Sequence, residues 1–343
     1  MRLCPAHLHP DLLAEGPAPQ VRRGGAWRVE ADRLHGAPPD HPPGDAIWLP
    51  ATPLFTAGGT QDYSAAMRTD IWDFGAPVAG HGWRPDGAVR ATVLLAHGFA
   101  EYAERYVTRY HRMVPRLVER GFAVHAFDYR GHGGSAGARG AVDVAAAVAQ
   151  HRQARAALAG TGPLLLFGHS LGGLVTAASV GADDADVAGV VLSAPALLLE
   201  ASPGLKLVGR VLARLAPGVG VRPALDPAGI SRDPAEVAAY RTDPRGYHGR
   251  LPAITGASAL AVADALWPRL PAWRAPVLVL HGTADSFCPI AGSERFVAAV
   301  AASAKRLARF EGGAHELLND LERDRALTMI LDWLEARLPS SRA

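Results

Sequence analysis

Cysteine and long apolar segments are both scarce in this 343-residue chain. It has two cysteines, Cys4 and Cys288, too few for the disulfide framework that stabilises small secreted domains. No uninterrupted apolar stretch reaches the roughly 18 residues of a membrane-spanning helix. Residues 1–19 lack a continuous apolar segment and are interrupted by prolines, so a secretory signal is not expected. We therefore expect a soluble, cytoplasmic protein with reduced thiols.

The chain also lacks a large excess of positive or negative charge. The net charge is +2, and no long run of lysine or arginine stands out. Proteins that bind nucleic acid normally carry a basic patch, so nucleic acid is not expected as a partner. What the chain does have is apolar content: 49% of its residues are hydrophobic, which suits one large domain with a sizeable core.

The pattern changes along the chain. Residues 1–60 are rich in proline, glycine and arginine, and we expect an irregular extension there. In residues 61–194 and 261–343, short apolar runs alternate with helical patterns, which predicts a mostly parallel α/β sheet with helices on both faces. Residues 195–260 lack a strong strand and are predicted to form a lid over the carboxyl edge of that sheet. Strands are expected at 91–96, 122–127, 164–167, 187–192, 277–280 and 306–310, and helices at 105–120, 142–158, 171–180, 292–302 and 321–337.

Residues 168–172 read GHSLG, which matches the pattern G-x-S-x-G. The motif follows an apolar strand and precedes a helical stretch, which is the context of a nucleophile elbow. In an elbow a strained turn presents the serine, and the helix N-terminus favours negative charge beside it. The sequence therefore predicts Ser170 as a nucleophile, and a glycine-rich turn in which Ser170 caps a helix is the plainer alternative.

A second loop is expected to face this elbow. Residues 97–100 read HGFA and follow the strand at 91–96. We expect the backbone N–H groups of Phe99 and Leu171 to form an oxyanion hole, in which each fixed donor lowers the barrier by about 3 kcal/mol. His97 is expected to make a structural hydrogen bond at the strand end, and Asp128 to stabilise its own loop.

Asp285 and His315 follow late strands of the predicted sheet. Asp285 comes just after the strand at 277–280, and His315 lies between the strand at 306–310 and the last helix. The chain order serine, aspartate, histidine is the order of an α/β-hydrolase triad. We predict that His315 removes the proton of Ser170 while Asp285 holds the imidazole tautomer. Taken singly, Asp285 can equally close a turn and His315 can cap a helix.

Other residues near this triad are given no catalytic role. Glu311 and Glu316 flank His315 and are expected to be solvated. Cys288 follows Asp285 on the same loop, so its thiol is expected close to the triad without belonging to it. It is either open to bulky thiol reagents or packed as a small inert side chain. No cofactor and no metal ion is predicted.

One helix of the predicted lid is strongly amphipathic. In residues 205–215 an apolar set recurs at the spacing of one helix face, and three cations recur every four residues on the other. We expect either a helix packed on the sheet with a solvated basic face, or a helix that borders an acyl pocket and contacts lipid surfaces peripherally. The apolar set is Val208, Val211, Leu212 and Leu215, and the cations are Lys206, Arg210 and Arg214.

Several segments together resemble one family. They are residues 97–106 (HGFAEYAERY), 128–135 (DYRGHGGS), 168–173 (GHSLGG) and the segments around Asp285 and His315. They are similar to those of the monoacylglycerol lipase and lysophospholipase branch of the α/β-hydrolases, a serine aminopeptidase-type hydrolase domain. The resemblance covers about residues 75–337. It implies the α/β-hydrolase fold and hydrolysis of a glycerol monoester or a similar lipid ester through an acyl-enzyme, without metal or organic cofactor.

Two residues depart from the family pattern. The family usually has glycine where Ala100 stands and histidine where Tyr102 stands, so acyl or alcohol preference can differ. A general carboxylesterase, a lysophospholipase and an acyltransferase stay open as alternatives, as do chain length and oligomeric state. A non-catalytic ligand-binding protein of the same fold is the alternative of a different class, and an intact triad disfavours it. The expected partner is a small lipid or ester substrate.

Overall fold

The computed structural model describes residues 67–339, which lie within one compact unit of the chain. The extension expected at residues 1–60 lies outside the described residues. Among the described residues, no helix combines the length and the apolar character that crossing a bilayer requires. The described part contains a large sheet, the helices that cover it, and an insertion between two of its strands.

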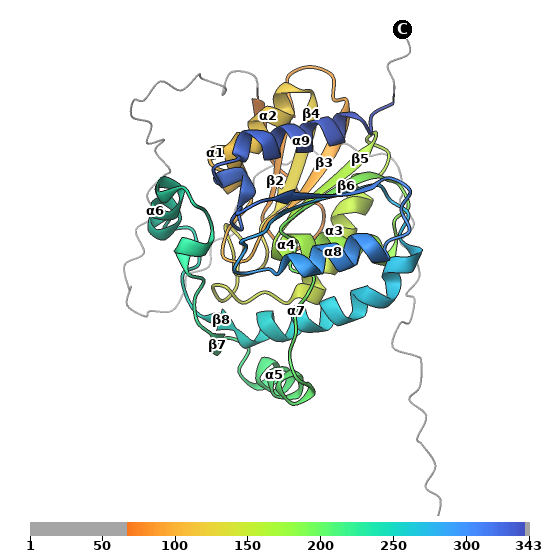
Figure 1. Ribbon diagram of the computed structural model, residues 1–343. Coiled ribbons are helices and arrows are strands. Elements are labelled where there is room, and N and C mark those ends of the chain that lie inside the picture. The colour runs from red at the N-terminus through yellow and green to blue at the C-terminus, as the bar shows by residue number, and fades with distance from the viewer. Residues whose placement is uncertain (1–66, 340–343) are drawn as a thin grey trace, which may run out of the picture. The chain divides into compact units, whose positions relative to one another are not determined.

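An eight-stranded sheet forms the centre of this unit (Figure 1). Its strands are β1 (Met67–Ile71), β2 (Gly80–Pro85), β3 (Ala91–Ala96), β4 (Phe122–Phe127), β5 (Leu164–His169), β6 (Val187–Ser193), β9 (Val277–Gly282) and β10 (Lys305–Phe310). Their order is β1-β2-β4-β3-β5-β6-β9-β10. The pairs β1–β2 and β2–β4 are antiparallel, and every other neighbouring pair is parallel. The predicted mostly parallel sheet is therefore confirmed, although the prediction did not include β1 and β2.

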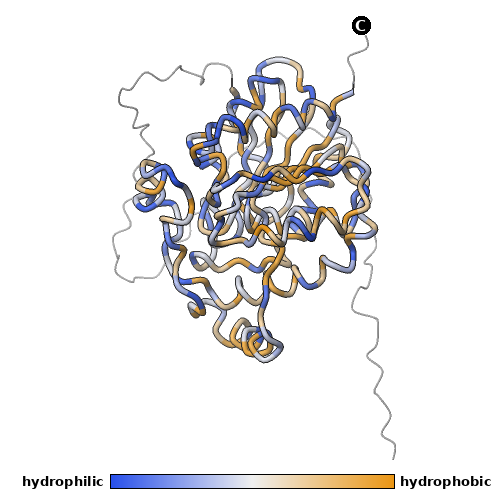
Figure 2. Tube along the Cα trace, viewed as in Figure 1, coloured by the Kyte–Doolittle hydropathy of each residue, from blue (hydrophilic) through white to orange (hydrophobic). Residues whose placement is uncertain are grey.

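Helices cover both faces of the sheet, as predicted (Figure 1). One face carries α2 (Met113–Glu119) and α9 (Arg323–Glu335), and the other carries α3 (Val144–Ala157), α4 (Leu171–Ala182) and α8 (Ile290–Ala299). Alternate residues of β3 enter different cores, since Leu94 packs on one face and its neighbours Val93 and Leu95 on the other. The central strands are accordingly apolar over most of their length (Figure 2).

The helix expected at residues 105–120 is interrupted. It consists of α1 (Arg105–Thr108) and α2, separated by a turn (η2, Tyr110–Arg112) in which three consecutive residues have φ between 50° and 56°. Left-handed backbone costs about 1–2 kcal/mol per non-glycine residue. Contacts from the segment after His315 hold the turn: Tyr110 N–H donates to Asn319 Oδ1 at 2.5 Å, and His111 Nε2 lies 2.7 Å from Asp324 Oδ1.

The chain leaves the sheet between β6 and β9. This insertion contains α5 (Pro203–Leu215), α6 (Pro234–Thr242), α7 (Ala253–Leu266) and an antiparallel pair of short strands, β7 (Gly220–Arg222) and β8 (Leu251–Pro252). Short 3₁₀ turns occur at η3 (Pro227–Gly229), η4 (Trp267–Ala272) and, after β10, η5 (Leu317–Asn319). The predicted lid boundary at residue 260 falls inside α7, which packs on both α4 and α5.

Candidate active site

Ser170 stands at the tight turn between β5 and α4. Its backbone has φ 53° and ψ −117°, a region that costs a non-glycine residue of order 1–3 kcal/mol. Backbone bonds hold the turn, because the Ser170 N–H donates to the carbonyl of Ser193 and its carbonyl accepts from the N–H of Ala196, both at 3.0 Å. Gly172 lets α4 approach β3, since a Cβ there would clash with the carbonyl oxygen of Ala96. Ser170 is thereby presented at the carboxyl end of the sheet.

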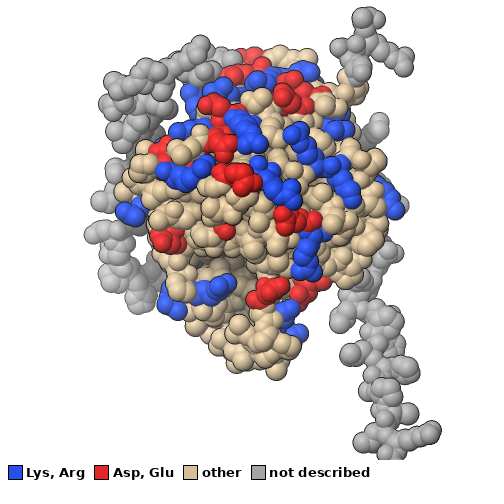
Figure 3. Space-filling view, viewed as in Figure 1, with Lys and Arg blue, Asp and Glu red and all other residues tan. Residues whose placement is uncertain are grey.

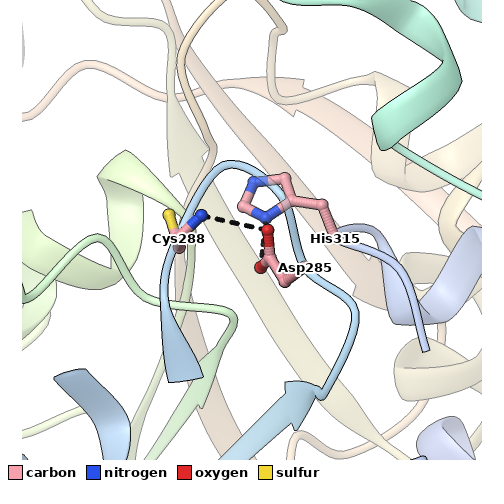
Figure 4. Close-up of side chains that lie close together, drawn as sticks. All are labelled: Asp285, Cys288 and His315. Atoms are coloured by element: carbon pink, nitrogen blue, oxygen red, sulfur yellow. Dashed lines mark hydrogen bonds and ion pairs between the residues drawn. The ribbon is translucent and has the colours of Figure 1, made fainter. Parts of the chain in front are cut away.

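The structure brings the predicted acid and base together (Figure 4). His315 Nδ1 lies 2.7 Å from Asp285 Oδ2, and both side chains are buried. Asp285 sits on the loop after β9 and His315 on the loop after β10, and these strands are neighbours in the sheet. Because Nδ1 faces the carboxylate, it carries the proton, which leaves Nε2 as the acceptor.

The surroundings of Asp285 and His315 shift the pKa values of both side chains. Burial would raise the pKa of the Asp285 carboxyl, but the charge of His315 and a hydrogen bond from His281 hold that pKa well below its usual range. Burial would lower the pKa of His315, but Asp285 raises it above the ordinary histidine value. The other carboxylate oxygen, Oδ1, accepts from the backbone N–H groups of Phe287 at 2.8 Å and Cys288 at 3.0 Å. The acid is therefore ionised and fixed by its own loop.

Cys288 lies beside Asp285 and His315, as the sequence suggested. One donor atom each of Asp285, Cys288 and His315 lie within 4.8 Å of one another (Figure 4). Burial and the charge of Asp285 raise the pKa of the thiol well above its ordinary value, while a hydrogen bond with Ser170 acts in the opposite direction. A raised pKa favours the inert interpretation of this cysteine. These three side chains could also suit a metal ion, but both oxygens of Asp285 already accept hydrogen bonds.

The loop after β3 lies against the elbow. A Cβ on Gly98 would lie 3.3 Å from the Cβ of Ser170, so the two segments are in contact. In the described part of the chain, the N–H groups of Phe99 and Leu171 donate to no other backbone group, as oxyanion-hole donors require. The neighbouring N–H of Gly98 is occupied, because it donates to the Glu101 carboxylate. Leu171 directly follows Ser170, and Phe99 directly follows Gly98, which contacts Ser170.

His97 and Asp128 make the structural bonds expected of them. His97 is buried, and its Nε2 accepts from the N–H of Tyr129 at 3.1 Å. The Asp128 carboxylate accepts from the N–H groups of Ala103 and Gly134, both at 2.8 Å. These bonds tie the loop after β4 to the loop after β3, which carries Phe99.

A buried charge network that the sequence did not predict lies behind the triad. Arg105 donates to the two oxygens of Glu316 at 2.8 and 3.1 Å and to Glu101 at 3.1 Å. The expectation that Glu316 is solvated is wrong: it is 4% exposed. Burial would raise the pKa of Glu316, but Arg105 holds it well below its usual range. Only the i, i+4 spacing of Glu101 and Arg105 gives a local signal, whereas Glu316 lies 211 residues away.

The predicted lid side chains lie on the outer side of α5. Val208, Val211 and Leu215 are 53%, 46% and 80% exposed, and Leu212 is half-buried. No residue of α5 is buried, so the alternative of a helix packed on the sheet is wrong. The helix faces α7 through Lys206 and Gly209: Lys206 Nζ lies 2.7 Å from Asp264 Oδ2, and a Cβ on Gly209 would lie 3.7 Å from the Cβ of Ala257. Arg210 and Arg214 are exposed. The apolar side forms a protrusion with little charge (Figures 2 and 3).

Comparison with known families gives a match over most of the described chain. The model of one family, described as serine aminopeptidase S33, matches residues 87–322. The match includes the elbow and both loops that carry Asp285 and His315. It ends before α9, and it includes the insertion between β6 and β9.

Relatives named as lipases are similar to this chain over most of their length. The chain is 37% identical over 262 residues to the monoacylglycerol lipase of Mycolicibacterium smegmatis, covering 75% of this chain and 92% of the relative. It is 29% identical over 246 residues to the human monoglyceride lipase, covering 70% and 80%. The crystal structure of Paleococcus ferrophilus monoacylglycerol lipase superposes with a TM-score of 0.67 at 32% identity, covering 73% and 96%.

Proposed function

Because this chain belongs to the serine aminopeptidase S33 family of hydrolases, we propose that it cleaves monoacylglycerols, with Ser170 as nucleophile. It has the predicted α/β-hydrolase fold and is a serine hydrolase of lipid esters, as its similarity to the Mycolicibacterium smegmatis and Paleococcus ferrophilus lipases shows. The observation that carries the assignment of the site is the buried 2.7 Å bond between His315 and Asp285 at the sheet edge where Ser170 stands.

The proposed reaction uses these groups in order. Nε2 of His315 removes the proton of Ser170 as its Oγ attacks the ester carbonyl, and Asp285 stabilises the imidazolium that forms. The N–H groups of Phe99 and Leu171 donate to the oxyanion. His315 then protonates the departing glycerol oxygen, which leaves an acyl-enzyme on Ser170. Water, deprotonated by His315, hydrolyses this intermediate and releases the fatty acid.

The substrate is tested by comparing hydrolysis of monoacylglycerols, lysophospholipids and p-nitrophenyl esters of graded chain length. We expect the highest kcat/KM for a long-chain monoacylglycerol, together with covalent labelling of Ser170 by a fluorophosphonate. Preference for a lysophospholipid or for acetate esters would overturn the proposal that monoacylglycerols are the substrate. Acyl products on an added alcohol would identify an acyltransferase, and absence of labelling would support a non-catalytic binder.

Activity is expected to fall on acidification with a midpoint above the ordinary histidine value of about 6.5. The base must be neutral, and the charge of Asp285 raises the pKa of His315, so the protonated, inactive form persists to higher pH. The measurement is kcat/KM against pH for a soluble ester. Asp285→Asn should move the midpoint to lower pH, and a profile flat down to about pH 5 would exclude His315 as the base.

We further propose that the outer side of α5 contacts the lipid surface that holds the substrate. Leu205, Leu207, Val208, Val211 and Leu215 are between 46% and 80% exposed, which makes an unusually apolar surface for a helix facing solvent. Arg210 and Arg214 border this side and suit anionic headgroups, whereas Lys206 is already paired with Asp264. An amphipathic helix of this kind binds in the plane of a membrane interface.

Replacing Leu207, Val211 and Leu215 together by serine tests this contact. Each side chain contributes about 1 kcal/mol when half-inserted, so vesicle binding should weaken by about a hundredfold. Hydrolysis of monoacylglycerol in vesicles should fall in parallel, while hydrolysis of p-nitrophenyl acetate stays unchanged. The measurements are co-sedimentation with anionic vesicles and kcat/KM for both substrates.

Ile71→Ser is the matched control, because Ile71 is 95% exposed on the edge strand β1 and lies outside α5. It should bind vesicles like the wild type. Equal losses on short and long esters in the triple variant would make α5 a scaffold and remove the proposed lipid contact.

A further inference from the structure

The loop that carries Phe99 is joined to a segment of the insertion, residues 243–247. The Tyr102 hydroxyl donates to Asp243 Oδ2 at 2.9 Å. The Arg245 guanidinium lies over the Tyr102 ring, 4.1 Å from its centroid, and forms an ion pair with Glu104. Tyr102 is 8% exposed, so its side chain is mostly shielded from solvent. Tyr102 therefore contacts two side chains of the insertion, those of Asp243 and Arg245.

The two backbones are joined as well. The N–H of Tyr247 donates to the carbonyl of Ala100 at 2.9 Å, and the rings of Phe99 and Tyr247 meet edge to face with centroids 5.8 Å apart. Ala100 has φ 71°, a left-handed conformation that a non-glycine residue adopts at a cost. Strained backbone persists only where its surroundings hold it. Segment 243–247 supplies that support at the residue next to Phe99.

We propose that Tyr102 is a positioning residue, which couples segment 243–247 to the oxyanion loop and so holds the Phe99 N–H in place for the reaction. This rests on the proposed function, because the Phe99 donor matters only when Ser170 attacks an ester. Burial and the charge of Asp243 raise the pKa of Tyr102, so its hydroxyl stays protonated and can donate. Tyr102 acts through the loop and not on the substrate.

This role has a distinctive kinetic consequence. A displaced oxyanion donor weakens transition-state binding and leaves ground-state binding alone, so kcat falls and KM does not change. The loss is independent of acyl chain length, because the oxyanion is the same in every ester. It therefore differs from the effect of changing α5, which acts on long-chain substrates.

Tyr102→Phe removes the hydroxyl and keeps the ring for Arg245. We expect kcat to fall about tenfold for short and long esters alike, with KM within about twofold of wild type. Amide hydrogen exchange of residues 98–104 should become about tenfold faster. Thr242→Val is the matched control, since it also removes one hydroxyl from the insertion, but this hydroxyl is exposed, lies outside segment 243–247 and donates to the carbonyl of Ala238 at 3.0 Å. It should behave as wild type.

Variants of Asp243 test the acceptor of the Tyr102 hydrogen bond. Asp243→Asn keeps an acceptor oxygen and should retain near-wild-type kcat. Asp243→Ala should lose at least as much kcat as Tyr102→Phe, because it also removes the bond from the Arg245 N–H to Asp243 Oδ1 at 2.9 Å. The double variant Tyr102→Phe/Asp243→Ala should be no slower than Asp243→Ala alone, because Asp243→Ala already removes the bond that Tyr102→Phe removes.

Normal exchange and normal kcat in Tyr102→Phe would overturn the proposal. Faster exchange with normal kcat would also overturn it, because the loop would then be held for stability alone. An increase in KM for long esters only would assign Tyr102 to substrate binding instead. If the wild type neither hydrolyses esters nor reacts with a fluorophosphonate, the proposed function fails and the positioning role falls with it, while the exchange data still report whether the contact holds the loop.

Discussion

Replacing Ser170 by alanine is expected to lower kcat by about 10⁵-fold. The acyl-enzyme requires the hydroxyl oxygen, and neither His315 nor the oxyanion donors can supply it. The loss corresponds to about 7 kcal/mol of activation free energy. The turn itself should persist, because backbone bonds to Ser193 and Ala196 hold it. The unfolding temperature should therefore stay at the wild-type value while labelling by a fluorophosphonate disappears.

Cys288→Ser is the matched control for this variant. The thiol lies in the same cluster and interacts with Ser170, yet no step of the proposed reaction uses it. The serine variant should retain most of the wild-type turnover. Turnover near wild type in Ser170→Ala would remove this serine from the mechanism, and an equal loss in both variants would point to packing of the loop around Cys288.

Arg105→Met is expected to destabilise the protein by about 4 kcal/mol, the largest effect on stability of any single change considered. The substitution keeps the aliphatic volume but removes the guanidinium, which leaves the carboxylates of Glu101 and Glu316 buried without their cation. For a domain of this size the unfolding temperature should fall by about 8 °C. Thermal unfolding at neutral pH measures this loss directly.

The difference from wild type should shrink as the pH falls. In the wild type the pKa of Glu316 is depressed, so its contribution to stability is present above the unfolded value of about 4.3 and is lost as the pH falls through the folded value. In the variant, burial instead raises the pKa of the same carboxyl, so it takes up a proton and loses its charge.

Arg309→Met tests whether loss of any ion pair has this effect. Arg309 pairs with Glu294 at 2.9 Å, but both side chains are about half exposed, so the variant should lose less than about 1 kcal/mol. A difference between Arg105→Met and wild type that does not change with pH would contradict the buried-charge explanation.

Strands buried on both faces were predictable and exposed ones were not. β3 and β4 begin and end at the predicted residues, because buried and mostly apolar residues mark both strands. β1 reads MRTDI and four of its five residues are exposed, so no run or alternation marks it. Its pairing with β2 comes from tertiary context, which periodicity does not report.

The turn at residues 110–112 shows a second limit of prediction from a local sequence pattern. Apolar spacing through Tyr106, Tyr110 and Met113 suits one continuous helix, and all three side chains are indeed buried. The left-handed backbone between them depends on Asn319 and Asp324, more than 200 residues away. A local pattern therefore locates the buried side chains without revealing the break.

In the candidate site, too, some residues were predictable from the sequence and others were not. The positions of Ser170, Asp285 and His315 follow from where strands end, so motif and chain order were sufficient to bring them to one edge. Glu316, the distant partner of Arg105, and Asp243, the partner of Tyr102, lie 211 and 141 residues away along the chain, beyond any local signal. The amphipathic pattern of α5 separates two faces but does not say which one faces the protein.

The sequence separation of the Arg105–Glu316 pair has a consequence for folding kinetics. These residues are 211 positions apart, so they meet only after the strands on both sides of β5 have assembled. Contacts that close such long loops are slow to form, because the entropy of closure precedes any gain. Until then both charges stay hydrated, and the His315 loop lacks its contact with Arg105. A refolding chain should therefore bury most of its apolar surface before it regains esterase activity, which makes catalysis a late reporter of the native state.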